Sequence, residues 1–317
     1  MTVAAEAIAH RSRRRPRLKR IAHASVPYLL ILPVIVVITA ILGYPLYKLV
    51  TLSFQQYGLA ELIQKKGVWI GFDNFSSVLH DEVFWRVLLR TVIFTAANVG
   101  LTIGLGTLIA FLLVRVSTWV RILLTAGLVL VWSMPAVVAV QVWVWMTNFE
   151  NGILNYVLTE LHVGDYTGHD WYGSTFSKLG MVTLLIVWGA IPFVAITVYA
   201  GLAQVPRELV EAAEIDGAGP VRVFRDVTFP VLKPIFLILT SLSIIWDFGV
   251  FTQPYLLIGS SAVDTSNYVM GVYVFIEGYA HSDFGRGAAI SLLMLLIVAV
   301  LSVFYVRRMV KMGEAAR

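Results

Sequence analysis

The stretch EAAEIDGAGP, residues 211–220, is the polar segment of this 317-residue chain that most needs an explanation. It combines three carboxylates with two glycines and a proline, which together suit a tight corner with an acidic edge. Apolar runs long enough to cross a bilayer lie on both sides of it. The chemistry of such a segment is recognition of another molecule rather than bond making.

The residues that catalysis would require are missing from the sequence. There is no cysteine, which excludes disulfides, thiolate nucleophiles and thiolate-bound metals. No phosphate-binding loop of the form GxxxxGK[ST] occurs, and no HExxH metal motif. All six histidines lie in the N-terminal tail or in expected outer loops: His10, His23, His80, His162, His169 and His281. We therefore predict a chain that is not an enzyme, with no metal site and no cofactor bound directly.

Asp247 is the one acidic residue near the middle of a long apolar run. A carboxylate at the centre of a membrane helix costs about 2.5–3.5 kcal/mol on insertion scales, so it should face a partner group or a watery cavity. Two interpretations stay open. Asp247 either lines a translocation path or braces two helices through a hydrogen bond.

Composition places the whole chain in a membrane. Hydrophobic residues make up 58% of it and charged residues 14%, where a soluble domain has about a quarter charged. Six segments are long and apolar enough to span, at about 27–53, 87–113, 122–147, 179–203, 234–258 and 285–306. Backbone groups in lipid must pair within their own segment, so these spans are expected to be helices. Prolines are expected to break three of them, at Pro135, Pro192 and Pro254.

The distribution of lysine and arginine sets the orientation. With the N-terminus inside, 17 of the 24 basic residues lie on the cytoplasmic side, as the positive-inside rule requires. This predicts a basic cytoplasmic tail at 1–25, a membrane domain at 26–310 and a cytoplasmic tail at 311–317. The start RSRRRPRLKR could also be a nucleic-acid arm, a twin-arginine signal or the start of a cleaved signal. The long first span and the five that follow favour a basic segment that fixes the membrane topology and contacts anionic lipid. We therefore expect no nucleic-acid partner.

Two expected outer loops, about 54–86 and 148–178, are rich in aromatic and acidic residues. They suit either a protein partner or an aromatic belt at the membrane interface, and the sequence does not separate the two.

The loop at 204–234 is expected to form two short helices on the cytoplasmic side. Pro206 suits a first helical position, and an apolar stripe recurs at helical spacing through Leu209 and Ala213. Gly217 follows the last turn, where a left-handed residue is usual, and Pro220 suits the start of a second helix that runs to about Phe229. This predicts a protruding helix–turn–helix that docks into another protein.

The same loop resembles the membrane-spanning permease subunit of binding-protein-dependent ABC importers, in the carbohydrate branch. The family motif is E-A-A, three residues, G, nine residues and then I-x-L-P. Here it stands as Glu211-Ala212-Ala213, Gly217 and Val227-x-Phe229-Pro230, with valine and phenylalanine replacing isoleucine and leucine. The segments GYPLYKLVTLSF, WIGFDNF, NGILNYVL and WGAIPF are also similar to the family, in order, so the resemblance covers roughly residues 26–310.

The resemblance implies an all-α membrane fold of six helices, the type I ABC importer permease fold, in a bacterial cytoplasmic (inner) membrane. It implies a second permease subunit, two copies of an ATP-binding subunit that hold ATP and Mg, and an extracytoplasmic substrate-binding protein. The coupling residues it implies are Glu211, Ala212, Ala213, Asp216, Gly217 and Pro230. Both termini would be cytoplasmic.

The segment IIWDFGVFTQPYLL, residues 244–257, looks like the fifth-span segment of sugar permeases. The resemblance suggests a substrate path formed by Trp246, Asp247, Phe251, Gln253 and Tyr255, with rings against sugar faces and polar groups on hydroxyls. The usual Gly-Gly-Pro turn is replaced by LIGSSAVDTSNY, and the aromatic spacing also fits plain packing. The expected function is a sugar or oligosaccharide permease. The alternative is an ion-coupled secondary transporter, which would need inverted repeats and several polar groups within the membrane.

Overall fold

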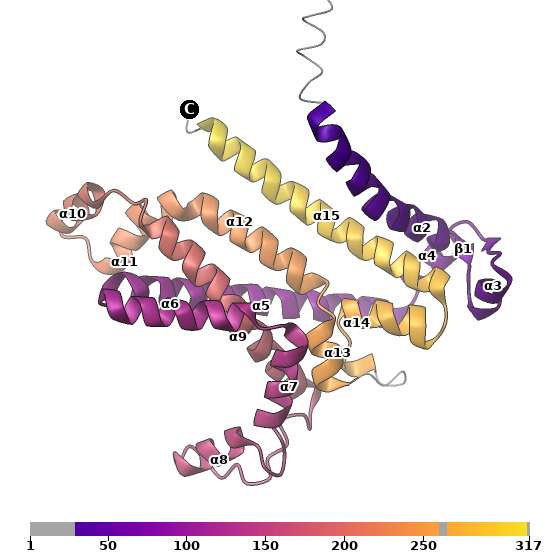
Figure 1. Cartoon of the computed structure of the whole chain (residues 1–317), viewed down its shortest axis with the longest axis horizontal. Helices are drawn as coiled ribbons and strands as arrows, with labels where there is room; N and C mark the ends of the chain where they lie inside the picture. Colours follow the sequence, from indigo (N-terminus) through magenta and orange to yellow (C-terminus); the bar gives the residue numbers. More distant parts are fainter. Residues whose placement is uncertain (1–28, 260–264, 316–317) are drawn as a thin grey trace, which may run out of the picture. The chain divides into compact units, whose positions relative to one another are not determined.

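The computed structural model describes residues 29–259 and 265–315, and it is helical almost throughout (Figure 1). The chain divides into two compact units, residues 1–51 and residues 52–317, and each is described by itself. The expected basic tail at 1–25 lies outside the described residues. The expected tail at 311–317 is helical as far as residue 315.

The first unit contains most of an apolar helix that runs from Leu29 to Ser53. Its described part includes a π-helical turn, η2 (Thr39–Gly43), and α2 (Tyr44–Ser53). At 1.5 Å per residue, 25 residues reach roughly 37 Å, enough to cross the hydrocarbon core.

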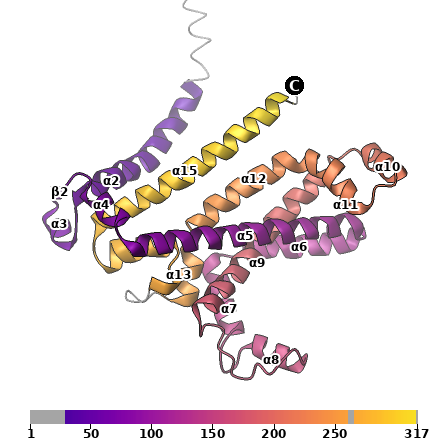
Figure 2. The ribbon, with the colours of Figure 1, turned by 180° about the vertical axis from the view of Figure 1, so that it is seen from behind.

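Four long helices form the frame of the second unit: α5 (Glu82–Arg115), α9 (Thr175–Leu202), α12 (Phe229–Phe248) and α15 (Phe284–Ala315). Helix α5 packs along α9 for most of its length, and α12 packs against α5, α9 and α15 (Figures 1 and 2). The shorter elements are β1 (Gln55–Gln56), α3 (Leu59–Gln64), β2 (Val68–Trp69), α4 (Asp73–Leu79), α8 (Ile153–Glu160), η4 (Thr265–Asn267), α14 (Met270–Phe275) and η5 (Ile276–Ala280). β1 and β2 pair antiparallel in a small outer hairpin.

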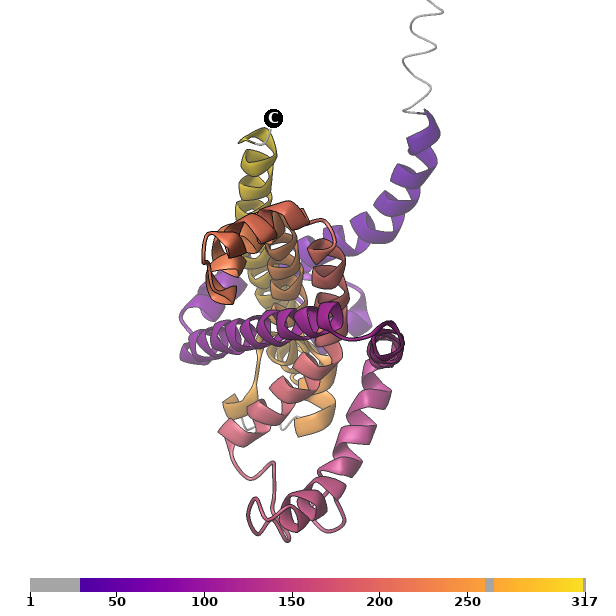
Figure 3. The same cartoon turned by 90° about the vertical axis from the view of Figure 1, so that its left-hand side faces the viewer.

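Six spans are confirmed, with one of them bent. Five described helices are long and apolar enough to cross a membrane, and the pair α6 (Thr118–Ser133) and α7 (Ala136–Met146) makes a sixth. The two helices of that pair are bent by 102° relative to each other. Figure 3 views α6 almost end-on, with α7 running away from it. Pro135 caps the start of α7, where its missing N–H is not needed. The break predicted at Pro135 is therefore present.

The breaks predicted at the other two prolines are wrong. Helix α9 continues through Pro192 without interruption. The fifth candidate span, Pro220–Phe248, ends at a break over residues 249–251, and Pro254 lies inside the short helix α13 (Thr252–Ile258) that follows. A proline in the first turn of a helix costs little, because the N–H groups there have no partner within the helix.

A polar cluster around Arg286 ties together the ends of several elements. The Arg286 guanidinium donates to Asp81 Oδ2 at 2.5 Å and to Glu277 Oε2 at 2.9 Å. Asp81 also caps α5, because its carboxylate accepts from the N–H of Val83 at 2.8 Å. Burial raises the pKa of Tyr273 to about 12, so its hydroxyl stays protonated and donates to Asp81 at 3.3 Å. One side chain thus links the starts of α5 and α15 to η5.

Replacement of Arg286 by methionine should therefore destabilise the second unit. It leaves the Asp81 and Glu277 carboxylates largely buried without their cation, at a cost of about 3 kcal/mol. The measurement is the thermal melting temperature of the purified protein in detergent. Arg307→Met, at an exposed position of α15, is the matched control and should melt like the wild type. Equal melting of both variants would show that the cluster contributes no stability.

The orientation gives a second prediction, which the absence of native cysteines makes simple to test. Ser76→Cys in α4 and Thr167→Cys in the 148–178 loop should react with an impermeant maleimide in intact cells. Both positions are exposed. Ile215→Cys should react only after the membrane is opened. Labelling of Ile215→Cys in intact cells would reverse the topology.

Candidate functional site

The break in the fifth span is where the membrane helices open toward a pocket. Helix α12 ends at Phe248, and Gly249, Val250 and Phe251 follow in a non-helical turn before α13 begins. Gly271 of α14 packs directly on this turn, because a Cβ at that position would collide with the carbonyl oxygens of Gly249 and Val250. Only glycine lets α14 come this close, so the packing of α14 supports the break.

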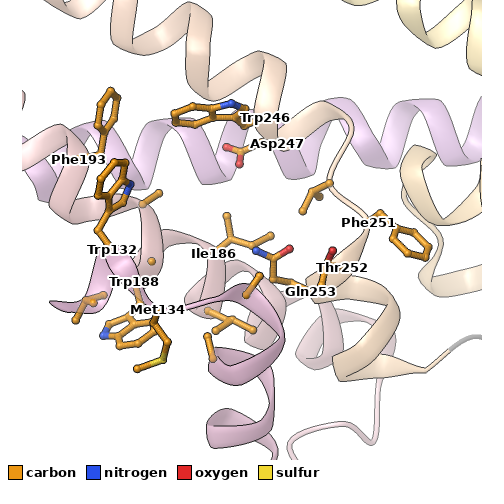
Figure 4. A pocket seen from close by; sticks show the side chains of 17 residues that line it. Trp132, Met134, Ile186, Trp188, Phe193, Trp246, Asp247, Phe251, Thr252 and Gln253 are labelled. Carbon is orange, nitrogen blue, oxygen red and sulfur yellow. The ribbon is translucent and has the colours of Figure 1, made fainter. Parts of the chain in front are cut away.

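A cavity of about 460 Å³ lies beside this break and also beside the bend at Pro135 (Figure 4). Residues from both interruptions line it, together with one face of α9. Non-helical backbone in a membrane is tolerated where it borders a cavity or is buried in protein. The two irregular segments of the membrane bundle thus converge on one pocket.

Aromatic rings dominate one side of this pocket. Trp132 and Phe193 stack with their ring centroids 6.1 Å apart, and Phe193 meets Trp246 edge to face at 5.6 Å. Trp188 also lines the cavity. In Figure 4 these rings lie on the left of the view, and Thr252 and Gln253 lie on the right. Broad ring faces beside a few polar groups are typical of a small-molecule site.

Asp247 is the only charged residue among those that line the pocket. It lies in the last turn of α12, 7% exposed. Within the described chain, no hydrogen bond or ion pair joins its carboxylate to another residue. The sequence left two interpretations of Asp247 open. In its described part, the structure contains no hydrogen-bond donor for the one in which Asp247 braces two helices.

The structure brings four of the five expected path residues together at the pocket: Trp246, Asp247, Phe251 and Gln253. Tyr255 does not line it. Its ring stacks on Phe251 at 4.8 Å and meets Phe275 at 5.0 Å, within the apolar core. Trp132, Trp188 and Phe193 also line the pocket from other spans and were not among the expected path residues. The sequence held two signals for them: Trp132 closely precedes Pro135, and Trp188 and Phe193 bound the segment WGAIPF that is similar to the family.

The second candidate site is the hairpin that contains EAAEIDGAGP. Helix α10 (Arg207–Ile215) is capped by Pro206, and Gly217 adopts the left-handed conformation with φ of +80°. Helix α11 (Pro220–Val223) then continues through a π-helical turn, η3 (Phe224–Thr228), directly into α12. The second helix was predicted to end near Phe229 and Pro230. It does not end there, because Pro230 lies in the first turn of α12 and leaves the helix intact.

Apolar side chains stand out on the surface of this hairpin. Ile215 is 86% exposed, Val221 is 81% exposed and Leu209 is 51% exposed. Glu211 and Glu214 are also exposed, and they line a cavity of about 770 Å³ that is shared with Arg115 and Arg121 at the ends of α5 and α6. Asp216 caps the end of α10. An exposed apolar patch with an acidic edge is typical of a surface that binds another protein.

Comparison with known proteins gives consistent matches along the chain. Residues 102–310 match the family described as binding-protein-dependent transport system inner membrane component. The chain is 44% identical over 300 residues to the diacetylchitobiose uptake system permease protein DasB of Streptomyces coelicolor, with 95% of this chain and 91% of that protein covered. It is 30% identical to the sulfoquinovosyl glycerol transport system permease protein SmoG of Agrobacterium fabrum, with 88% of each covered.

A solved structure shows the same fold. A chain from a bacterial ABC transporter that imports the acidic polysaccharide alginate superposes with a TM-score of 0.77. The match covers 93% of this chain and 99% of that chain, at 19% sequence identity.

Proposed function

The chain belongs to the family of binding-protein-dependent transport system inner membrane components, and we propose that it forms half of the pore of an ATP-driven saccharide importer. One observation carries the proposal. A single chain presents an aromatic pocket between two helix interruptions in its membrane bundle, and an exposed hairpin with apolar side chains next to the membrane helices.

The pocket supports a saccharide as the cargo. The C–H faces of a sugar ring are apolar and pack on indole and phenyl faces, while its hydroxyls need donors and acceptors. Trp132, Phe193 and Trp246 supply the faces, and Asp247 and Gln253 supply polar groups. The relative from Streptomyces coelicolor is named for the uptake of diacetylchitobiose, a saccharide, which agrees with this chemistry.

The hairpin supports a separate ATPase as the source of energy. The sequence has no phosphate-binding loop, so ATP and Mg would be held by a partner subunit. Glu211, Ala212, Ala213 and Gly217 lie on α10 and its turn, from which Ile215 and Val221 project into solvent. Because η3 joins the hairpin to α12 without a break, a push on the hairpin would move α12 and the pocket at its far end.

The assembly we propose contains a second permease, two ATPase copies and a soluble binding protein on the outer side. The binding protein would deliver cargo near the loops at 54–86 and 148–178. Closure of the ATPases would rock the two permeases as near-rigid bodies, so that the pocket opens to each side in turn. Both termini and the hairpin would face the cytoplasm.

An ion-coupled secondary transporter is disfavoured by the same structure. Such a protein carries several ionisable groups along its path. In the described spans, Asp247 is the one acidic residue that lies in the pocket. The family match also points to a transporter that depends on a binding protein.

Trp246→Ala tests the pocket. Loss of one indole face should weaken saccharide binding to the purified transporter about tenfold, or ~1.4 kcal/mol. Trp119→Ala is the control, because Trp119 lies on α6 outside the pocket and is exposed. The change in affinity is measured by titrating the cargo into the purified transporter and recording the intrinsic fluorescence of the protein. Unaltered affinity in Trp246→Ala would show that this ring is not part of the cargo site.

Gly217→Val tests the hairpin. A residue with a side chain in the left-handed conformation costs about 1–2 kcal/mol, so valine should redirect α11 and spoil the docking surface. Gly219→Val is the matched control in the same turn, because Gly219 has an ordinary φ of −71° and open space around its Cα. Glu211→Ala should also weaken coupling by removing a carboxylate of the docking edge.

The readouts are retention of the ATPase during purification and cargo-stimulated ATP hydrolysis. Insertion in the membrane should be normal for all three variants, because positions 211, 217 and 219 lie outside the candidate spans. Gly217→Val should lose most of its stimulation and Gly219→Val should keep it. Full retention and stimulation in Gly217→Val and Glu211→Ala would show that the hairpin is not the coupling element.

A further inference from the structure

The pocket concentrates negative charge at one point. Asp247 is its only charged lining residue, and it lies in the last turn of the 20-residue helix α12. The C-terminus of a helix carries a partial negative charge of about half a unit. The carboxylate and the C-terminal end of α12 therefore both make the electrostatic potential negative in the same part of the cavity.

Nothing in the described lining balances this charge. No lysine, arginine or histidine borders the pocket. The basic residue of α12 is Lys233, which lies 14 residues away along the helix, or roughly 21 Å at 1.5 Å per residue. Buried carboxylates are normally paired or hydrogen-bonded, because desolvation of an isolated charge is costly. A cation that enters the pocket would supply the partner that the described chain lacks.

The surroundings of Asp247 indicate what that partner is. Its neighbour Trp246 places a half-exposed indole in the same pocket, and Phe193 and Trp132 extend the row of rings. A cation is attracted both by a carboxylate and by the face of an aromatic ring. An anion in the same place meets repulsion from the carboxylate and from the end of α12, with no basic side chain in the lining to offset it.

We propose that Asp247 selects the cargo by charge, and that the preferred cargo is a saccharide carrying an ammonium group, such as an amino sugar with a free amine. The inference rests on the proposed function and narrows its substrate class. The amine pairs with Asp247 while the sugar ring lies against Trp246. Saccharides with a carboxylate or a sulfonate at that position are rejected.

Three disaccharides of similar size test this selection directly. Chitobiose carries two free amines, N,N′-diacetylchitobiose is neutral, and digalacturonate is anionic. Each is titrated at pH 7 into the purified transporter complex without its binding protein, so that selection by the binding protein is excluded. The wild type should bind chitobiose about tenfold more tightly than the diacetyl form, and digalacturonate more weakly than both.

Asp247→Asn keeps the shape and removes the charge. Chitobiose affinity should fall about tenfold in this variant, while affinity for the diacetyl form should change less than twofold. Gln253→Glu adds a second carboxylate to the same pocket and should strengthen the preference for chitobiose. Glu150→Gln removes a carboxylate from the outer loop, away from this pocket, and should leave all three affinities unchanged.

Two results would overturn the inference. If Asp247→Asn ranks the three sugars as the wild type does, Asp247 does not select by charge, although the proposed saccharide function stands. The same holds if the variant only lowers the yield of assembled complex, because Asp247 then pairs with another subunit. Failure of all three disaccharides to bind the wild type would remove the proposed saccharide pocket as well.

Discussion

The structure depends on one constraint, which is that backbone groups within a bilayer must find their partners inside the protein. Six apolar spans meet it by forming helices, one of them bent. The chain departs from continuous helix within the bundle at Pro135 and at residues 249–251, and both departures border the same cavity. Irregular backbone in lipid is expensive, and its position beside one pocket supports the proposal that the membrane domain meets its cargo there.

Helix α12 connects this pocket to the hairpin. It ends at the cavity on one side, and on the other it continues through η3 and α11 to the turn at Gly217. The exposed apolar residues of the hairpin and one ring of the pocket, Trp246, are therefore joined by continuous helix. The Arg286 cluster holds the starts of α5 and α15 together with η5. Such an arrangement suits a subunit that moves as a body, driven from the hairpin, rather than one that carries out chemistry itself.

The sequence located the spans to within about five residues except for the fifth, which was predicted at 234–258 and lies at Pro220–Phe248. It also placed the hairpin and its left-handed glycine, because composition, charge and turn chemistry act locally. The predictions failed where packing between residues far apart in the sequence determines the local structure. The fifth span breaks before Pro254, where Gly271 of α14 covers the backbone of Gly249 and Val250. Tyr255 has the right spacing for the pocket, yet Phe275 draws its ring into the core. Trp132, Trp188 and Phe193 reach the pocket from two other spans, and no local pattern marks them as neighbours of Asp247.

The central claim is that ATP hydrolysis on a partner drives saccharide movement through a pore that this chain helps to form. Uptake of labelled N,N′-diacetylchitobiose tests it most directly, in proteoliposomes that contain the chain, its partner permease, the ATPase and the binding protein. Uptake should require ATP on the ATPase side and the binding protein on the other, and ionophores that collapse proton and sodium gradients should not reduce it. Uptake that proceeds without ATP and stops when an ion gradient is collapsed would contradict the account.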